Sequence, residues 1–141
     1  MALIEFFDNR ARVKAALNEA IIAYLHEMGG EMKSQTQHNT RVDTGQTKGS
    51  WTYVVDQEAG ECVIGSPLQN AIWEEFGTGE FADDGKGRKE LPWVYRDAKG
   101  KFHTTRGKKP SRAFQTAFNK LKNKLVKRIG TIISEAMNSD N

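Results

Sequence analysis

The chain has 141 residues, which is the size of one domain and excludes two large ones. Its composition, 38% hydrophobic and 28% charged with a net charge of +3, excludes a collagen-like or wholly disordered chain and predicts a globular protein with a modest core. No stretch approaches the roughly 18 consecutive apolar residues of a membrane span, and we expect no membrane partner. The first residues lack a basic leader followed by a long apolar run, and the single cysteine, Cys62, cannot form an internal disulfide. These features favour the cytoplasm.

Charge is distributed unevenly along the chain. Residues 1–85 carry 6 basic and 14 acidic side chains, whereas residues 86–128 carry 15 basic and 2 acidic ones. A solvated basic helix face and loop, the commoner case, is one interpretation. The other is a surface that faces a polyanion or docks against the acidic part of a neighbouring copy.

The first predicted element is a long helix over residues 9–38. Apolar side chains recur at intervals of three and four from Val13 to Met32, so they share one helix face. The pair Gly29 and Gly30 interrupts the run, and each glycine costs roughly 1 kcal/mol relative to alanine. We therefore expect a bend or a break there.

A hairpin and a short helix are expected next. Residues 50–55 and 61–65 are rich in β-branched and aromatic side chains and predict two antiparallel strands. Pro67 suits the first turn of the following helix, because its missing N–H would be unbonded there. Gly77 and Gly79 should end that helix.

The short helix carries two adjacent carboxylates, Glu74 and Glu75. Neighbours on a helix point about 100° apart, so the two cannot share one catalytic site. We expect one to face solvent and the other to cap or pair locally, while Trp73 and Phe76 anchor the helix in the core.

Residues 80–90 predict a flexible loop, because they offer charge and glycine but little to bury. After the loop, residues 93–96 and 101–104 flank turn residues and predict a second hairpin. A final helix should begin at Pro110 and run to about Met137.

One apolar stripe follows this final helix, and residues 138–141 should fray beyond it. The stripe comprises Phe114, Phe118, Leu121, Leu125, Ile129, Ile132 and Ala136. The order of elements predicts one α+β domain over residues 1–141: a small antiparallel sheet packed against long N- and C-terminal helices, with a short central helix and an inserted hairpin.

No motif for catalysis or metal binding emerges. His26, His38 and His103 lie on different predicted elements, and none has a second ligand at helical spacing. Cys62 has no histidine placed beside it by a motif, and no Gly-x-Ser-x-Gly sequence occurs. We therefore expect a non-enzymatic protein with no cofactor and no metal.

Aromatic and basic side chains alternate over residues 93–106. Such a segment could stack bases and contact phosphates. Alternation in a hairpin also places aromatic side chains on the core face and cations in water, and this structural interpretation is preferred. The residues concerned are Trp93, Tyr95, Arg96, Lys99, Lys101, Phe102 and Arg106.

Three stretches together resemble one family, the small phage neck and minor tail proteins. Residues 41–50 are similar to its V-D-T-G-x-L-x-x-S turn, residues 70–79 to its Y-A-x-x-x-E-x-G-T-G box, and residues 109–118 to its P-x-x-F-x-x-A segment. The residues that carry the resemblance are Val42, Asp43, Thr44, Gly45, Trp73, Glu75, Phe76, Gly77, Thr78, Gly79, Pro110 and Phe114. Physically, Asp43 can lock a turn by accepting backbone N–H groups, and Gly45 and Gly77 suit positive φ.

The resemblance covers about residues 9–135 and implies a structural virion assembly protein of long-tailed double-stranded DNA phages and prophages. Such a protein joins or completes the tail at the head–tail junction, and is found in the host cytoplasm during assembly and then in the virion. The implied partners are other neck and tail proteins (connector, stopper, tail terminator or tail tube) and further copies in a ring, with non-specific contact to packaged DNA.

A basic patch could face that DNA or a neighbouring subunit. Its members are Arg88, Lys89, Arg96, Lys101, Arg106, Lys108, Lys109 and Arg112. The alternative function is a small nucleic-acid-binding regulator or nuclease that uses residues 93–106.

Overall fold

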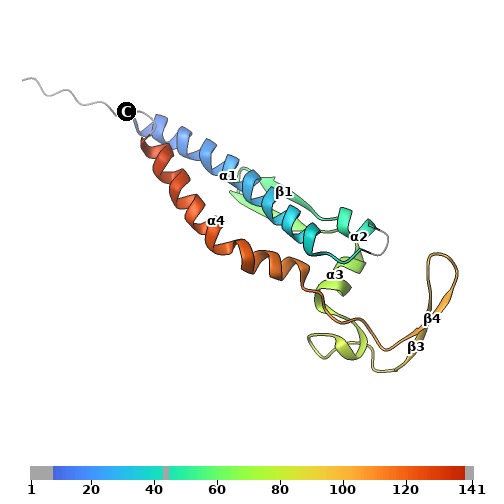
Figure 1. Cartoon of the computed structure of the whole chain (residues 1–141). Helices are drawn as coiled ribbons and strands as arrows, with labels where there is room; N and C mark the ends of the chain where they lie inside the picture. The colour runs from blue at the N-terminus through green and yellow to red at the C-terminus, as the bar shows by residue number, and fades with distance from the viewer. Residues whose placement is uncertain (1–7, 43–44, 139–141) are drawn as a thin grey trace, which may run out of the picture.

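The computed structural model describes residues 8–42 and 45–138. The predictions for Asp43, Thr44 and residues 139–141 lie outside these ranges. The predicted α+β class is confirmed: two long helices, α1 (Arg10–Asn39) and α4 (Ala113–Asn138), run antiparallel along an elongated molecule (Figure 1). Asn138 is the last residue of α4 and is not part of a frayed tail. No described helix combines the length and apolar character that crossing a bilayer requires.

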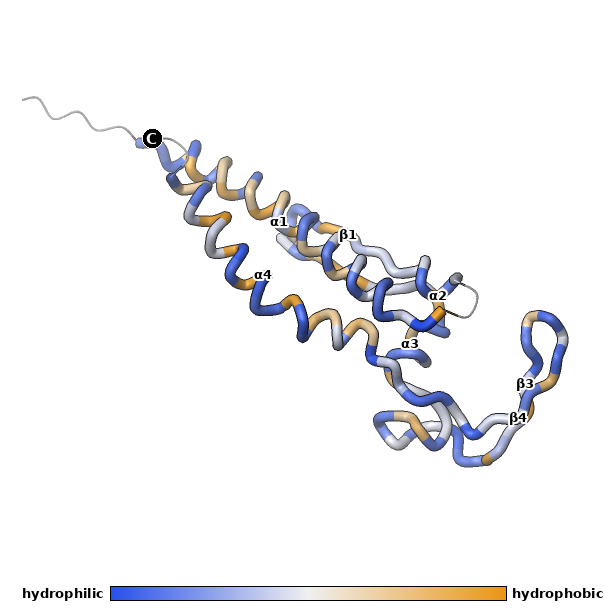
Figure 2. Tube along the Cα trace, in the orientation of Figure 1, coloured by the Kyte–Doolittle hydropathy of each residue, from blue (hydrophilic) through white to orange (hydrophobic). Residues whose placement is uncertain are grey.

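The core lies between α1 and α4. Met32, Ala117 and Leu125 form its centre, and the Tyr24 hydroxyl donates a hydrogen bond of 2.7 Å to the carbonyl of Leu125. Apolar and polar residues alternate along α4, as a helix with one buried face requires (Figure 2). Small side chains occupy much of that face and let the two helices approach closely.

The predicted stripe of α4 is correct at Leu125, Ile132 and Ala136, which are buried, and wrong at Phe118, which is 48% exposed. Ala117 occupies the core position instead, with no exposed surface. Phe118 lies about 100° further around the helix and therefore points away from α1.

Gly29 and Gly30 do not break α1, contrary to expectation, and the helix continues to Asn39. Gly29 is buried where the first hairpin crosses the helix. A Cβ at this position would come within 2.5 Å of the Tyr53 ring and 2.8 Å of the Cys62 sulfur. The glycine therefore permits close packing of the hairpin.

The first predicted hairpin is confirmed as β1 (Thr52–Asp56) and β2 (Glu61–Gly65), paired antiparallel with Tyr53 opposite Ile64. A single helical turn, α2 (Gln46–Gly49), precedes it. Tyr53 and Cys62 face α1, so one side of this sheet is covered by the helix.

The short helix α3 (Gln69–Phe76) begins two residues after Pro67, so the proline is not in its first turn. It ends at Gly77, as predicted, with φ 79°. A 3-10 helix, η1 (Gly79–Phe81), follows and opens the predicted loop of residues 80–90. This loop packs back on the chain, because a Cβ at Gly87 would overlap the carbonyl of Gly79.

The second hairpin is also confirmed, as β3 (Trp93–Arg96) and β4 (Phe102–Thr105). It forms a separate two-stranded sheet that projects from the end of the molecule (Figure 1). The expectation that its aromatic side chains face a core is wrong: Tyr95 is 47% and Phe102 68% exposed. No helix within residues 8–42 and 45–138 packs broadly on this ribbon, and Trp93, His103 and Thr105 on one face are only half-buried.

Candidate functional site

The segments that carry the sequence motifs come together at the end of the helix pair where α4 begins. We call the contact between residues 74–80 and 106–112 the α3 junction. The amide of Thr78 donates to the carbonyl of Lys108 at 2.9 Å, and the amide of Lys108 donates to the Thr78 hydroxyl at 2.9 Å. The amide of Glu80 donates to the carbonyl of Arg106 at 3.1 Å. Two segments about thirty residues apart thus lie side by side.

The glycines of the junction are required by its geometry. Gly77 has φ 79°, which confirms the predicted positive φ, and its missing side chain leaves room for the carbonyls of Phe81 and Lys108. Gly79 has φ 60°, and a Cβ there would overlap the carbonyl of Arg106. Gly45 has φ 81° as predicted, but a Cβ there would meet no atom of the described residues within 4 Å, its chain neighbours aside.

Glu75 caps α4 from outside that helix. Its two carboxylate oxygens accept the amides of Phe114 and Gln115, each at 2.9 Å. These amides belong to the first turn of α4 and have no partner within the helix. The negative charge also lies at the positive end of the helix dipole.

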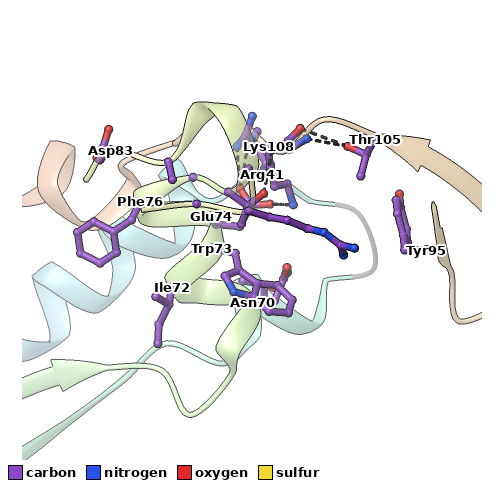
Figure 3. A pocket seen from close by; sticks show the side chains of 18 of the residues that line it. Arg41, Asn70, Ile72, Trp73, Glu74, Phe76, Asp83, Tyr95, Thr105 and Lys108 are labelled. Carbon is purple, nitrogen blue, oxygen red and sulfur yellow. Dashed lines mark hydrogen bonds and ion pairs between the residues drawn. The ribbon is translucent and has the colours of Figure 1, made fainter. Parts of the chain in front are cut away.

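Glu74 accepts two cations in the same junction. Its Oε2 lies 3.0 Å from an Arg41 Nη2, and its Oε1 is paired with the Lys108 ammonium (Figure 3). Arg41 also donates to the carbonyl of Lys109 at 2.8 Å. The expectation that one of the two glutamates faces solvent is therefore wrong, because Glu74 is 6% and Glu75 7% exposed.

The predicted anchors of α3 are also corrected. Trp73 is 45% exposed and Phe76 52% exposed, so neither holds the helix in the core. The buried positions are Ala71, Glu74 and Glu75, which share one face at helical spacing. This face is polar in sequence and is nevertheless buried, because two cations pair with Glu74 and two backbone amides donate to Glu75.

An open groove of about 1100 Å³ lies between α3 and the base of the second hairpin. Trp73 and Phe76 of α3 and Trp93 and Tyr95 of the second hairpin are among its lining residues. Figure 3 shows Tyr95 on the hairpin, across from Trp73 on α3. Arg41 also borders it. The oxygens of Glu74 are occupied by cations and those of Glu75 by amides, so neither is presented as a free base.

The eight predicted basic residues do not form one continuous free patch. Four of them face carboxylates and are thereby tied to the local fold. The pairs are Arg88 with Glu90, Arg106 with Glu80, Lys108 with Glu74, and Arg112 with Asp83.

The other basic residues contact neutral partners or solvent. Arg96 lies 5.8 Å from the Phe102 ring, and Lys109 lies 5.7 Å from the Phe81 ring. The Lys89 ammonium reaches a backbone carbonyl, and Lys101 is exposed on the second hairpin. Two members of the predicted patch, Arg96 and Lys101, thus sit on the projecting hairpin.

Outside the α3 junction, the surroundings of Asp97 and Cys62 shift the pKa values of these two groups. The imidazole of His103 is 2.7 Å from Asp97, and this hydrogen bond, followed by the backbone amide of Lys101, holds the pKa of Asp97 below its ordinary value. Burial raises the pKa of the Cys62 thiol. Across residues 8–42 and 45–138, no three His, Cys, Asp or Glu side chains gather as metal ligands.

Sequence reasoning missed Arg41 and Asp83 as ion-pair partners of junction residues. Arg41 directly precedes the Val42 motif, so its position was a usable signal. Asp83 lay in a stretch that was assigned to a loop, and nothing local marked it as the partner of Arg112.

Comparison of the chain with protein-family models, with curated proteins and with solved structures finds no match. The resemblance to phage neck proteins accordingly rests on the three motifs and on their order along the chain.

Proposed function

We propose that the chain is a structural virion assembly protein at the phage head–tail junction, where it joins or completes the tail by protein–protein contacts and works without enzymatic activity. Its location would be the host cytoplasm during assembly and the virion afterwards. The proposal combines the motif resemblance with the physical character of the described surface.

The observation that carries the proposal is the large apolar surface that the fold leaves uncovered. Among the described residues, twelve large apolar side chains are exposed, and six are buried. A monomer of this size ordinarily covers most such groups, and contiguous exposed apolar patches mark interaction sites. The exposed groups are spread over both hairpins, α3 and α4, with Val42 beyond the end of α1.

The α3 junction supports the same proposal. The motif residues Glu75, Gly77, Thr78 and Gly79 form hydrogen bonds and close backbone contacts that hold the hairpin segment to the helices. These residues therefore stabilise a scaffold, and the surface of this scaffold is suited to binding other proteins. A subunit of a ring or a tail cap requires this property.

Deletion of the gene in the phage or prophage that encodes the chain tests the proposal. We expect particles blocked between filled heads and tails, visible by electron microscopy, and restoration by the wild-type gene supplied in trans. Mass spectrometry of purified complete particles should detect the chain. Normal infectious titre from the deletion, together with absence of the chain from particles, would overturn the proposal.

A second function, a nucleic-acid-binding regulator or nuclease that uses residues 93–106, is favoured by one observation. Phe102 is exposed beside Arg96, and Tyr95 is exposed on the other face of the ribbon, so both rings are accessible to bases. A gel shift at graded salt separates the two functions. Assembly proteins should bind DNA weakly, without sequence preference, and release it by about 0.2 M salt, because the contacts are to phosphates. Tight, sequence-preferring binding by the monomer would favour the regulator.

A further inference from the structure

The outer side of the first hairpin is uncovered. Val54 and Val63 lie directly opposite each other in the β1–β2 register and are 66% and 63% exposed. Asp56 and Glu61 form the next pair on the same side, toward the turn. We call these four residues the acidic hairpin face.

Two carboxylates stand directly opposite each other on this face, an arrangement that destabilises a strand pair. Asp56 is partly engaged, because its Oδ1 accepts the amides of Glu58 and Ala59 at 3.0 Å. Glu61 makes no ion pair with any residue that the structure describes. A cation from another molecule would relieve this repulsion.

The second hairpin presents an exposed face of opposite charge. Val94 and Phe102 are 62% and 68% exposed, and Arg96 lies opposite Phe102 in the β3–β4 register. Thr104, opposite Val94, completes this side. We call these four residues the basic hairpin face.

We propose that the basic hairpin face of one copy docks on the acidic hairpin face of a second copy. Val94 and Phe102 would cover Val54 and Val63, and Arg96 would meet the Asp56 and Glu61 carboxylates. The inference deepens the proposed assembly function and rests on it, because it names the surfaces through which copies join. The two faces belong to hairpins that lie at different parts of the molecule (Figure 1).

A contact between two different faces is heterologous, so each copy keeps one free face of each kind and further copies can add until a ring closes. The apolar share of the basic face argues for this occupant over a nucleic acid. A nucleic acid could pair a phosphate with Arg96 and stack a base on Phe102, but it would leave the aliphatic Val94 uncovered. A second copy satisfies the apolar and the charged groups together.

Disulfide trapping tests the proposal on the full-length chain. A Val54→Cys chain is mixed with a Phe102→Cys chain of different tag length, and the mixed dimer is followed on non-reducing gels. Val126→Cys is the matched control, because Val126 is 68% exposed on α4, the same fraction as Phe102. The wild-type chain, whose only thiol is the half-buried Cys62, measures the background.

We expect the Val54–Phe102 mixed dimer to form about tenfold or more faster than either mixture with Val126→Cys, because docking raises the local thiol concentration. Equal rates for all mixtures would overturn the proposal. Arg96→Glu in the Phe102→Cys chain should bring trapping down to the control rate. Glu61→Arg in the Val54→Cys chain should then restore it.

Lys122→Glu on α4 is the control for charge, since it makes the same change on an exposed position away from both faces. It should leave trapping unchanged. A trapping rate that Arg96→Glu does not change would overturn the assigned pairing of the two faces. The outcome is separable from that of the proposed function: particles that contain the chain but give no Val54–Phe102 disulfide refute only the docking.

Discussion

Glu74 and Glu75 are adjacent in the sequence, yet they stabilise different parts of the molecule. Glu75 accepts two amides at the start of α4, and Glu74 accepts Arg41 and Lys108. Both are buried, so their charges are tolerated only because donors surround them. At the scale of single residues, stability therefore depends on polar side chains at the α3 junction.

Glu75→Gln should lower the free energy of unfolding by about 1–3 kcal/mol, because one acceptor oxygen becomes an amide that faces a backbone N–H. Chemical denaturation followed by circular dichroism measures the change. The matched control, Glu58→Gln in the exposed β1–β2 turn, should stay within about 0.5 kcal/mol of the wild type. Equal effects of the two substitutions would contradict the capping role.

Gly77 and Gly45 both have positive φ but differ in the rest of their surroundings. Gly45 has φ 81° and ψ −12°, the left-handed helical region, where an alanine carries a backbone strain of about 1–2 kcal/mol. Gly77 has φ 79° and ψ 172°, a region that is essentially restricted to glycine, so the backbone strain of an alanine is larger there. Only at Gly77 would the new Cβ also meet carbonyl oxygens, at 2.7 and 2.9 Å. Gly77→Ala should therefore destabilise the chain clearly more than Gly45→Ala in urea titrations. Similar losses would show that crowding at the junction is relieved by movement.

At the scale of elements, α4 is stabilised by the packing of one of its faces against α1. Leu125 is 5% exposed and packs with Met32 and Ala117, whereas its neighbour Val126 is 68% exposed. The two residues have similar apolar character and differ in which side of the helix they occupy. Position on the helix, not residue type, decides their contribution.

Leu125→Asp should destabilise the protein by about 4 kcal/mol or more, because an unpaired carboxylate would replace a packed side chain. Thermal unfolding followed by circular dichroism should show loss of the cooperative transition or a large drop in melting temperature. Val126→Asp, one residue along, should change stability by no more than about 0.5 kcal/mol. A stable Leu125→Asp chain would contradict the α1–α4 packing.

The second hairpin depends on its turn, because none of the described helices packs broadly on it. Asp97 accepts the amides of Lys99 and Lys101 at 2.9 Å and the His103 imidazole at 2.7 Å. These donors stabilise the ionised carboxylate. They close the turn and hold the two strands in register.

The turn should therefore weaken in acid. The folded-state pKa of Asp97 lies below its ordinary value, so the stabilisation is complete above about pH 4 and is lost as the pH falls through the lower, folded-state pKa. Proton exchange of the Lys99 and Lys101 amides, followed by NMR against pH, measures it. Asp97→Asn should abolish the acid dependence. An unchanged dependence would assign it to another group.

At the scale of the whole molecule, the chain is an elongated pair of helices with one covered sheet and one projecting hairpin (Figure 1). Helix α1 has 30 residues and α4 has 26, lengths of about 45 and 39 Å at 1.5 Å per residue. A compact chain of this length would have a radius of gyration of about 14 Å. The solvent-accessible surface is large relative to the small number of large side chains that are buried in the core.

Small-angle scattering should accordingly give a radius of gyration clearly above about 14 Å for the monomer. Light scattering in the same chromatographic run must confirm a single chain, since association would also raise the value. A monomer near 14 Å would show that the hairpin folds back against the helices.

The sequence alone determined the main elements and their order, but not the short α2 and η1. Both long helices, both hairpins and the end of α3 at Gly77 follow from local rules: helical periodicity, β-branched runs and the backbone freedom of glycine. These rules act over a few residues, so they hold wherever the element is placed. The backbone freedom of glycine also predicted the positive φ of Gly45 and Gly77.

Only the tertiary structure decided what each element meets. Periodicity predicted which side chains share a face of the second hairpin and of α3, but it could not predict whether another part of the chain covers that face. Phe102 and Trp73 are exposed, and Glu74 is buried. The partners of Glu74 and Glu75 are about 33 to 40 residues away in the chain. Burial and pairing depend on such long-range contacts, and these form only when the helices and loops come together in space.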